Sequence, residues 1–269
     1  MSQQRPLVSS WMLAVGIALV APIELPARAE SALTLPTPGI TGNIDAHTYD
    51  ESGQRVGDAS IAFDELDSGN FLLVGRSGIE GSARTEVRAE FVPVENDRLR
   101  LVYQQTQAHD ESGQSLGVMS IDHRKGVAMC GAPPGSGKKS VEVKLPEQDR
   151  VVNVPLNLLF QPLVKGEVEQ IRFQVLLCRV GARLVNAKAR VTESPERDEP
   201  GLIEVRYSLD FGPLLSKLAA PFMPRLSFWF QDSSPGNWIG HRMPLFSKGP
   251  TVLVVRSGFA PTVFGTAGQ

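Results

Sequence analysis

RTEVRAEF, residues 84–91, alternates apolar and polar side chains along the chain. Val87, Ala89 and Phe91 fall on one side of an extended backbone, and the charged residues between them fall on the other. This alternation is typical of strands with one buried and one wet face. Strands of a parallel sheet read instead as continuous apolar runs, so the pattern predicts an antiparallel sheet. The same period of two recurs at residues 98–104, 171–177, 185–191 and 203–209.

Helical segments are scarce between these strands. Residues 154–165 (VPLNLLFQPLVK) predict one short helix, broken at Pro162, and residues 212–220 (GPLLSKLAA) are a second candidate. Two short helices cannot cover both faces of a large sheet, so one face is wet and the other folds onto itself or is plugged. We therefore predict an all-β fold: a single strongly curved antiparallel sheet, a half-barrel or a closed barrel, with one or two short helices covering its concave side.

The first 29 residues have the layout of a secretory signal peptide. Arg5 makes the start positively charged, residues 11–21 (WMLAVGIALVA) form an apolar run, and residues 27–29 (ARA) resemble a cleavage site. The apolar run is shorter than the ~20 residues that span a bilayer. We expect cleavage after Ala29, a periplasmic or secreted protein without an integral membrane span, and a single all-β domain over residues 30–269.

A repeat covers residues 50–61 (DESGQRVGDASI) and 110–121 (DESGQSLGVMSI), which agree at eight of twelve positions. One interpretation is a pair of acidic loops that bind a ligand. The other is a hairpin unit used twice, because Asp-Glu-Ser-Gly suits a type I turn followed by a glycine with positive φ. The residue types are those that the turn requires, so we favour the hairpin.

The chain contains two cysteines, Cys130 and Cys178. In an oxidising compartment the two can pair. A bridge across that separation would stabilise the fold by roughly 4 kcal/mol in the chain-entropy model. The alternative is two buried thiols, since sequence separation does not fix the geometry of the Cβ atoms.

Motifs for cofactors, metals and catalysis are missing or incomplete. Residues 132–138 (APPGSGK) resemble the start of a phosphate-binding loop, but Lys139 stands where the magnesium-binding Ser or Thr belongs, and a strand-like pattern follows. The four histidines lack zinc-site spacing, and no G-x-S-x-G elbow is present. The net charge of −2 lacks the basic excess of a nucleic-acid binder. We predict no cofactor, no metal site, no catalytic residue and no nucleic-acid partner.

Aromatic residues gather in residues 224–250. One interpretation is an aromatic rim for an apolar ligand, with Arg225, Arg242 or Lys248 meeting an anionic head group. The other is a pair of terminal strands that close the core, because aromatics at strand spacing pack mostly in cores. The candidate ligand-binding residues are Phe228, Phe230, Trp238, Arg242 and Phe246.

Four short features together resemble the DUF3108-like group of uncharacterised bacterial secreted proteins. They are the signal peptide with an early hairpin at Gly53–Gly57, the Pro162–Gly166 segment, the Phe228–Phe230 strand, and the later Pro-Leu pair at residues 244–245. The resemblance implies an envelope protein with a curved antiparallel sheet, similar in shape to periplasmic lipid and lipoprotein carriers, and no assigned reaction. The two cysteines and the 132–139 loop depart from that pattern.

Three functions fit these features. The first is a non-enzymatic periplasmic protein that binds an apolar or amphipathic, lipid-like ligand inside a curved sheet. The alternative is a structural or protein-interaction module of the cell envelope, which would present a long unpaired edge strand or a large exposed apolar patch to a protein partner. The third is a secreted hydrolase whose residues come from distant strands.

Overall fold

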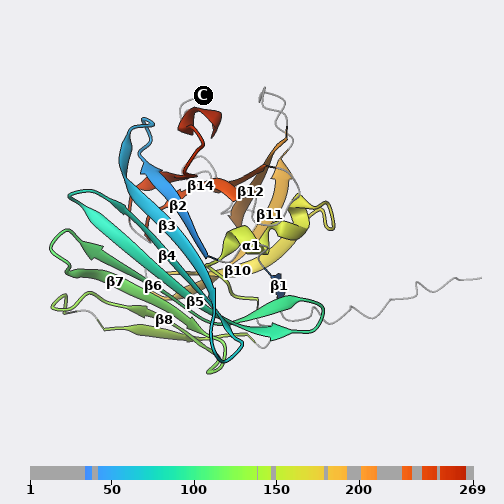
Figure 1. Cartoon of the computed structure of the whole chain (residues 1–269). Coiled ribbons are helices and arrows are strands. Elements are labelled where there is room, and N and C mark those ends of the chain that lie inside the picture. Colours follow the sequence, from blue (N-terminus) through green and yellow to red (C-terminus); the bar gives the residue numbers. More distant parts are fainter. Residues whose placement is uncertain are drawn as a thin grey trace, which may run out of the picture. The chain divides into compact units, whose positions relative to one another are not determined.

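The period-two segments form strands of one antiparallel sheet in the computed structural model (Figure 1). The structure describes residues 34–37, 42–137, 139–146, 150–178, 181–192, 201–210, 226–231, 238–246 and 249–264. The predicted signal peptide, the 212–220 helix, Arg225 and Lys248 lie outside these ranges. The strands are β1 (Thr34–Pro36), β2 (Gly42–Tyr49), β3 (Arg55–Glu65), β4 (Phe71–Ile79), β5 (Ala83–Val94), β6 (Arg98–Asp110), β7 (Ser115–Asp122), β8 (Val127–Gly131), β9 (Val141–Lys144), β10 (Ile171–Leu177), β11 (Arg183–Thr192), β12 (Leu202–Asp210), β13 (Leu226–Gln231), β14 (Trp238–Pro244) and β15 (Thr251–Arg256).

The strands pair in a single path, β10-β11-β12-β13-β14-β15-β2-β3-β4-β5-β6-β7-β8-β9, and β1 pairs with β6 beside this path. Among the described strands, β9 and β10 end the path and do not pair with each other. The sheet curls around the helical segment that contains α1 (Figure 1). The predicted all-β fold with a strongly curved antiparallel sheet is therefore confirmed, in its open, half-barrel form.

The two ends of the sheet overlap at a seam made of side chains. Ile121 pairs with Gln104, which pairs with Ala89 of the main core, so Ile121 lies on the concave face. Leu176 lies on the opposite face of β10 from the core residue Val175, and it packs in one cluster with Ile121. The concave side of β7–β8 therefore covers the outer side of β10.

A disulfide joins Cys130 of β8 to Cys178, which follows β10, with 5.5 Å between the two Cα atoms. Beside it, Val151 forms a parallel bridge with Gln174 of β10. The bond thus links the two sheet ends that the backbone ladder leaves unpaired. In the chain-entropy model a bridge of this separation contributes roughly 4 kcal/mol.

The predicted helix at 154–165 forms two four-residue turns, α1 (Leu156–Leu159) and α2 (Gln161–Val164). The expected break at Pro162 is wrong, since the two turns meet at Phe160. Pro162 lies in the first turn of α2, where the missing N–H would have no intrahelical partner. The leucines of both turns are buried in the main core, so the helices fill part of the concave side as predicted. Among the described residues no helix has the length and apolarity needed to cross a membrane.

Both copies of the repeat form hairpins. In each, an aspartate carboxylate (Asp50 or Asp110) accepts hydrogen bonds from a serine hydroxyl and a glutamine N–H, and the following glycine has φ of +83° or +82°. Each copy also carries a register shift beside the turn, at Thr48/Tyr49 and at Ala108/His109. The hairpin interpretation is confirmed, and the repeat encodes a bulge as well as a turn.

Candidate functional site

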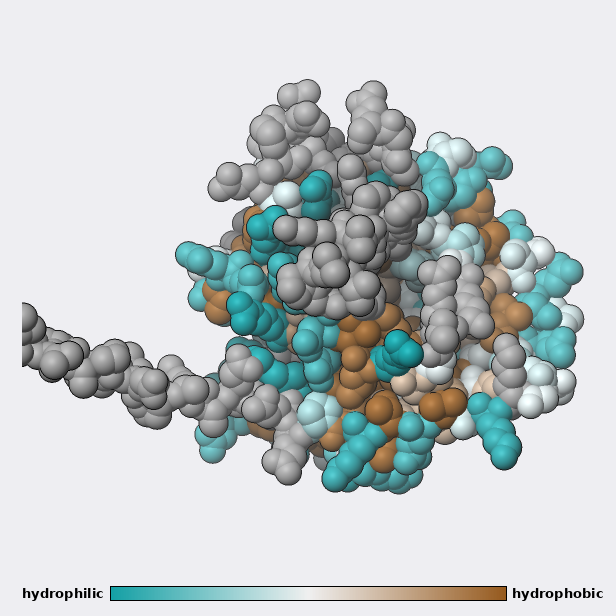
Figure 2. All heavy atoms as spheres, turned by 180° about the vertical axis from the view of Figure 1, so that it is seen from behind, coloured by the Kyte–Doolittle hydropathy of each residue, from teal (hydrophilic) through white to brown (hydrophobic). Residues whose placement is uncertain are grey.

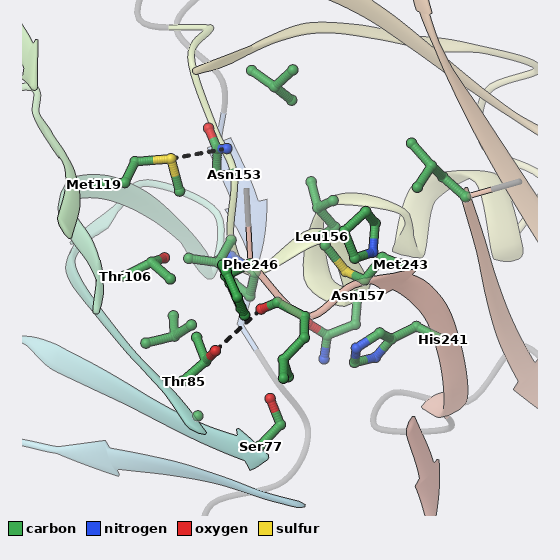
Figure 3. Close-up of a pocket in the computed structure, with 18 of the residues that line it drawn as sticks. Ser77, Thr85, Thr106, Met119, Asn153, Leu156, Asn157, His241, Met243 and Phe246 are labelled. Atoms are coloured by element: carbon green, nitrogen blue, oxygen red, sulfur yellow. Dashed lines mark hydrogen bonds between the residues drawn. The ribbon is translucent and has the colours of Figure 1, made fainter. Parts of the chain in front are cut away.

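A cavity of about 890 Å³ lies on the concave side of the sheet (Figure 3). Its described walls come from β3–β7, from residues 153–157 at the start of α1, and from β10–β15 with Leu245 and Phe246. Most of the lining side chains are apolar. Its size falls within the ~300–1,000 Å³ of typical small-molecule sites.

Three of the five candidate ligand-binding residues line this cavity: Phe228, Trp238 and Phe246. Phe230 is fully buried in the main core and does not line it. Arg242 lies on the other face of the sheet, where its guanidinium stands 5.7 Å from the centre of the Trp229 ring. The five residues therefore do not form one site, and the structure does not place Arg242 beside the cavity.

A bulge explains the position of Arg242. Residues four apart on a regular strand share a face, and by this rule Trp238 and Arg242 would do so. The β13–β14 register shifts at Trp229/Phe230, so that Trp229 pairs with Gly240 while Phe230 pairs with Trp238. Ile239 is the extra residue, and it moves Arg242 to the outer face.

Phe246 reaches the cavity because Gly249 has no side chain. A Cβ at Gly249 would come within 2.6 Å of the Phe246 ring, closer than real Cβ atoms approach. The chain around the ring is held by a backbone hydrogen bond from Gly249 N–H to the Phe246 carbonyl. Sequence reasoning missed this dependence, since a glycine in a Pro- and Gly-rich turn has many other reasons to be there.

The wall formed by residues 153–157 is held by two amide side chains, of the buried Gln104 and the half-buried Asn153. Gln104 Oε1 accepts hydrogen bonds from the N–H groups of Asn153 and Val154. The Asn153 side chain accepts from Leu176 N–H and donates to the Leu176 carbonyl. Asn153 thus gives Leu176 of β10 the two hydrogen bonds that a neighbouring strand would provide, and it positions α1 against the cavity. The sequence offered no local signal for this contact, because Gln104, Asn153 and Leu176 are distant in the chain.

His241 is the polar residue at the centre of the aromatic wall. Its ring stacks on Phe228 with 5.1 Å between ring centroids and lies 5.5 Å from the Trp238 ring. Burial among these groups lowers the pKa of His241 to about 4, so the imidazole is neutral at pH 7. Figure 3 shows His241 lining the cavity together with Ser77 and Asn157.

Charged side chains are few in the described lining. Arg76, Arg183 and Asp210 belong to the lining, and all three residues are exposed. Arg76 directs its guanidinium to the Glu86 carboxylate at 3.0 Å. The cavity can therefore hold an apolar group, and its buried part offers uncharged hydrogen-bonding partners.

A second group of polar residues lies on the outer face. Ser257 Oγ is 3.4 Å from His47 Nε2, and His47 Nδ1 is 3.0 Å from Asp58 Oδ1, which is the order of a serine hydrolase triad. The Asp58 side chain is 67% exposed and is also bound by Arg55, which lowers the pKa of Asp58 together with His47. In hydrolases the orienting carboxylate is buried, so the arrangement matches the triad in order but not in environment.

The structure also tests the phosphate-loop-like segment and the metal-site motifs that the sequence raised. The glycine-rich segment that begins at residue 132 connects β8 to β9, so a strand follows it where a phosphate-binding loop needs a helix. Within the described ranges, no three His, Cys, Asp or Glu side chains gather closely enough to hold a metal ion.

The features expected of an interaction module are limited in the described part. β9, one end of the sheet path, has only four residues, and Val151 covers part of β10 at the other end. Seen from behind, apolar side chains gather in the lower middle of the surface, bordered by hydrophilic ones (Figure 2). The exposed large hydrophobic residues are scattered over several elements: Leu66, Leu116, Val141, Val168 and Val191.

Comparisons with known proteins add little. No family model matches the chain, and no curated protein matches it. Among solved structures, it is similar to a β-barrel-like protein of the domain of unknown function DUF1849 from Brucella abortus. The identity is 10% and the TM-score 0.38, over 81% of this chain and 98% of that chain. A likeness this distant carries no functional argument, and the resemblance to DUF3108-like proteins stays a prediction.

Proposed function

We propose that the protein is a non-enzymatic periplasmic protein that binds an apolar or amphipathic ligand in the cavity of its curled sheet. The cavity of about 890 Å³ is the observation that carries this proposal. Protein interiors are close-packed and contain few voids larger than a water molecule. A space of this size with a mostly apolar lining is therefore best explained as a binding site.

The compartment is supported by the chain's own features. Residues 1–29 have the pattern of a signal peptide. The Cys130–Cys178 disulfide fits an oxidising compartment, where such bonds persist. An envelope carrier is also what the resemblance to DUF3108-like proteins implies.

The proposal is tested by filling the cavity. Gly75 lies on β4 in the cavity wall, and a Cβ added there meets its nearest atom, on Val87, at an ordinary 3.7 Å. Gly75→Leu places an apolar side chain in the space without changing the strand. We expect the wild-type protein to bind N-phenyl-1-naphthylamine, a neutral apolar fluorophore, and Gly75→Leu to weaken this binding at least tenfold. Native mass spectrometry of the gently purified protein should show a bound lipid-like mass that the variant lacks.

The matched control is Ala62→Leu, which adds the same side chain to the neighbouring strand. Ala62 precedes the core residue Phe63, so its side chain points to the outer face, and it does not line the cavity. Fluorophore binding should be unchanged in this variant. Equal binding by the wild type and Gly75→Leu would show that the cavity is not the binding site.

The row Ser257–His47–Asp58 favours a hydrolase as the second candidate. A working triad would hydrolyse p-nitrophenyl acetate at a rate that Ser257→Ala and His47→Ala both abolish. We expect the wild type and both variants to hydrolyse this ester equally slowly. A rate that depends on Ser257 would replace the non-enzymatic proposal.

A further inference from the structure

Some polar side chains in the cavity wall have a described protein partner, and others have none. Thr85 donates to the Leu245 carbonyl at 3.2 Å, and Asn153 is occupied by Leu176 and Met119 (Figure 3). Ser77, Asn157 and His241 also line the cavity, yet their side chains form no hydrogen bond in the part of the chain that the structure describes. These three come from β4, α1 and β14, so the sheet and the helix both present free polar groups to the same space.

His241 is the most informative of these groups. It is fixed by ring contacts with Phe228 and Trp238, which are only 4% and 2% exposed. A neutral imidazole has one N–H donor and one nitrogen acceptor. Polar groups removed from bulk water are normally hydrogen-bonded, because leaving them unpaired is costly. His241 is half-buried and lines the cavity, so a ligand that displaces water from its imidazole must itself supply the hydrogen-bonding partner.

The charge of that partner follows from the surroundings. The described lining contains two basic side chains, Arg76 and Arg183; both residues are exposed, and Arg76 pairs with Glu86. A carboxylate or phosphate bound at His241 would be a buried anion facing a neutral imidazole, which is unfavourable. A hydroxyl, ester or amide can pair with the imidazole and with Ser77 or Asn157 without introducing a charge.

We propose that the ligand is an amphipathic molecule with an uncharged polar group, which hydrogen-bonds to His241 while its hydrocarbon part fills the apolar remainder of the cavity. This inference rests on the proposed function, because it names the ligand class of the same site. It predicts that neutral lipids, such as long-chain alcohols or acylglycerols, bind better than the free fatty acids of the same chain length.

The test compares three probes with the same carbon number: dodecane, 1-dodecanol and dodecanoate. Each is measured by displacement of N-phenyl-1-naphthylamine from the full mature protein at pH 7.5. We expect 1-dodecanol to bind at least tenfold more tightly than dodecanoate. His241→Phe keeps an aromatic ring against Phe228 but removes both nitrogens, so it should weaken 1-dodecanol binding by about five- to tenfold and leave dodecane unchanged. His47→Phe, on the outer face, is the matched control and should behave as the wild type.

Each of the alternative outcomes would overturn this inference, and one of them would also overturn the proposed function. Tighter binding of dodecanoate than of 1-dodecanol would overturn the neutral class and leave the proposed function standing. An equal loss of dodecane and 1-dodecanol in His241→Phe would show that His241 only shapes the cavity, which also overturns the inference. If the fluorophore binds neither the wild type nor Ala62→Leu, the proposed function fails and this inference falls with it.

Discussion

The concave face of the sheet is packed at one end of its strands and hollow at the other. Along β3, the inward residues become smaller from Phe63 through Ile61 to Ala59. Phe63 is in the packed end, where its ring centroid lies 5.5 Å from that of Phe71 and 5.9 Å from that of Phe91. Ile61 and Ala59 line the cavity.

The neighbouring strands follow the same gradient. On β4 the inward residues change from Leu73 to Gly75 and Ser77, and Ser77 pairs with Thr85 of β5, which also lines the cavity. Beyond this pair, Ile79 and Ala83 pack against the main core. The hydrogen-bonded register continues through both ends without interruption between β3 and β4. On the β3–β5 wall, the cavity therefore results from the size of the side chains on a regular ladder, and not from a break in the backbone.

The largest effect is expected from the packed end. Phe91 is fully buried and its removal leaves a space that the surrounding rings cannot fill. Phe91→Ala should lower the free energy of unfolding by about 3–5 kcal/mol, measured by urea denaturation. Fluorophore affinity of the folded protein should be unchanged, because Phe91 does not line the cavity. A variant that keeps its stability but loses binding would reverse the roles of the two ends.

A smaller effect is expected from His241 at the hollow end. Burial lowers its pKa in the folded state to about 4, below the ~6.5 of an unfolded chain. As the pH falls below about 6.5, the unfolded chain takes up a proton that the folded protein does not. The contribution of His241 to the free energy of unfolding should therefore be fully present above pH 6.5. The free energy of unfolding should fall by roughly 2 kcal/mol between pH 7 and pH 5.

The measurement is urea denaturation at both pH values, with NMR titration of the His241 ring. His241→Phe should lose this part of the pH dependence, and His47→Phe should keep it. A water-filled cavity would solvate the imidazolium and return the pKa toward 6.5. A measured pKa near 6.5 would thus show that the hollow end is wet, and the dry apolar character of the cavity would be wrong.

The sequence predicts the strands, turns and curvature of the sheet better than it predicts the cavity. Alternation along residues 84–91 follows from local chemistry, and the turns at Asp50 and Asp110 follow from residue types that the turn requires. The curvature also follows, because the chain has too little helix to cover a sheet of this size. These features depend on neighbours in the chain, so one sequence is enough to identify them.

The cavity depends on which strands are neighbours. Ala59, Ser77 and Thr85 are unremarkable in their own segments, and they form a hollow only because the register places them side by side. The bulge at Ile239, which sends Arg242 to the outer face, has no local sequence signal. The partners of Asn153 and the lack of a partner for His241 are likewise properties of the folded chain.

The smallest effect concerns the hydrogen bond at the boundary of the hollow end. Thr85 is 5% exposed, and its hydroxyl donates to the Leu245 carbonyl at 3.2 Å. Thr85→Val keeps the side-chain shape but leaves that carbonyl without this donor, so the free energy of unfolding should fall by about 1 kcal/mol. Thr106→Val is the matched control, because Thr106 lines the same cavity without a described hydrogen bond of its hydroxyl, and it should cost nearly nothing. If both substitutions cost the same, the loss comes from hydration of the threonine hydroxyls and not from the bond to Leu245. The hollow end would then hold water, and the gradient from Phe63 to Ala59 would mark a solvent-filled space and not an apolar binding site.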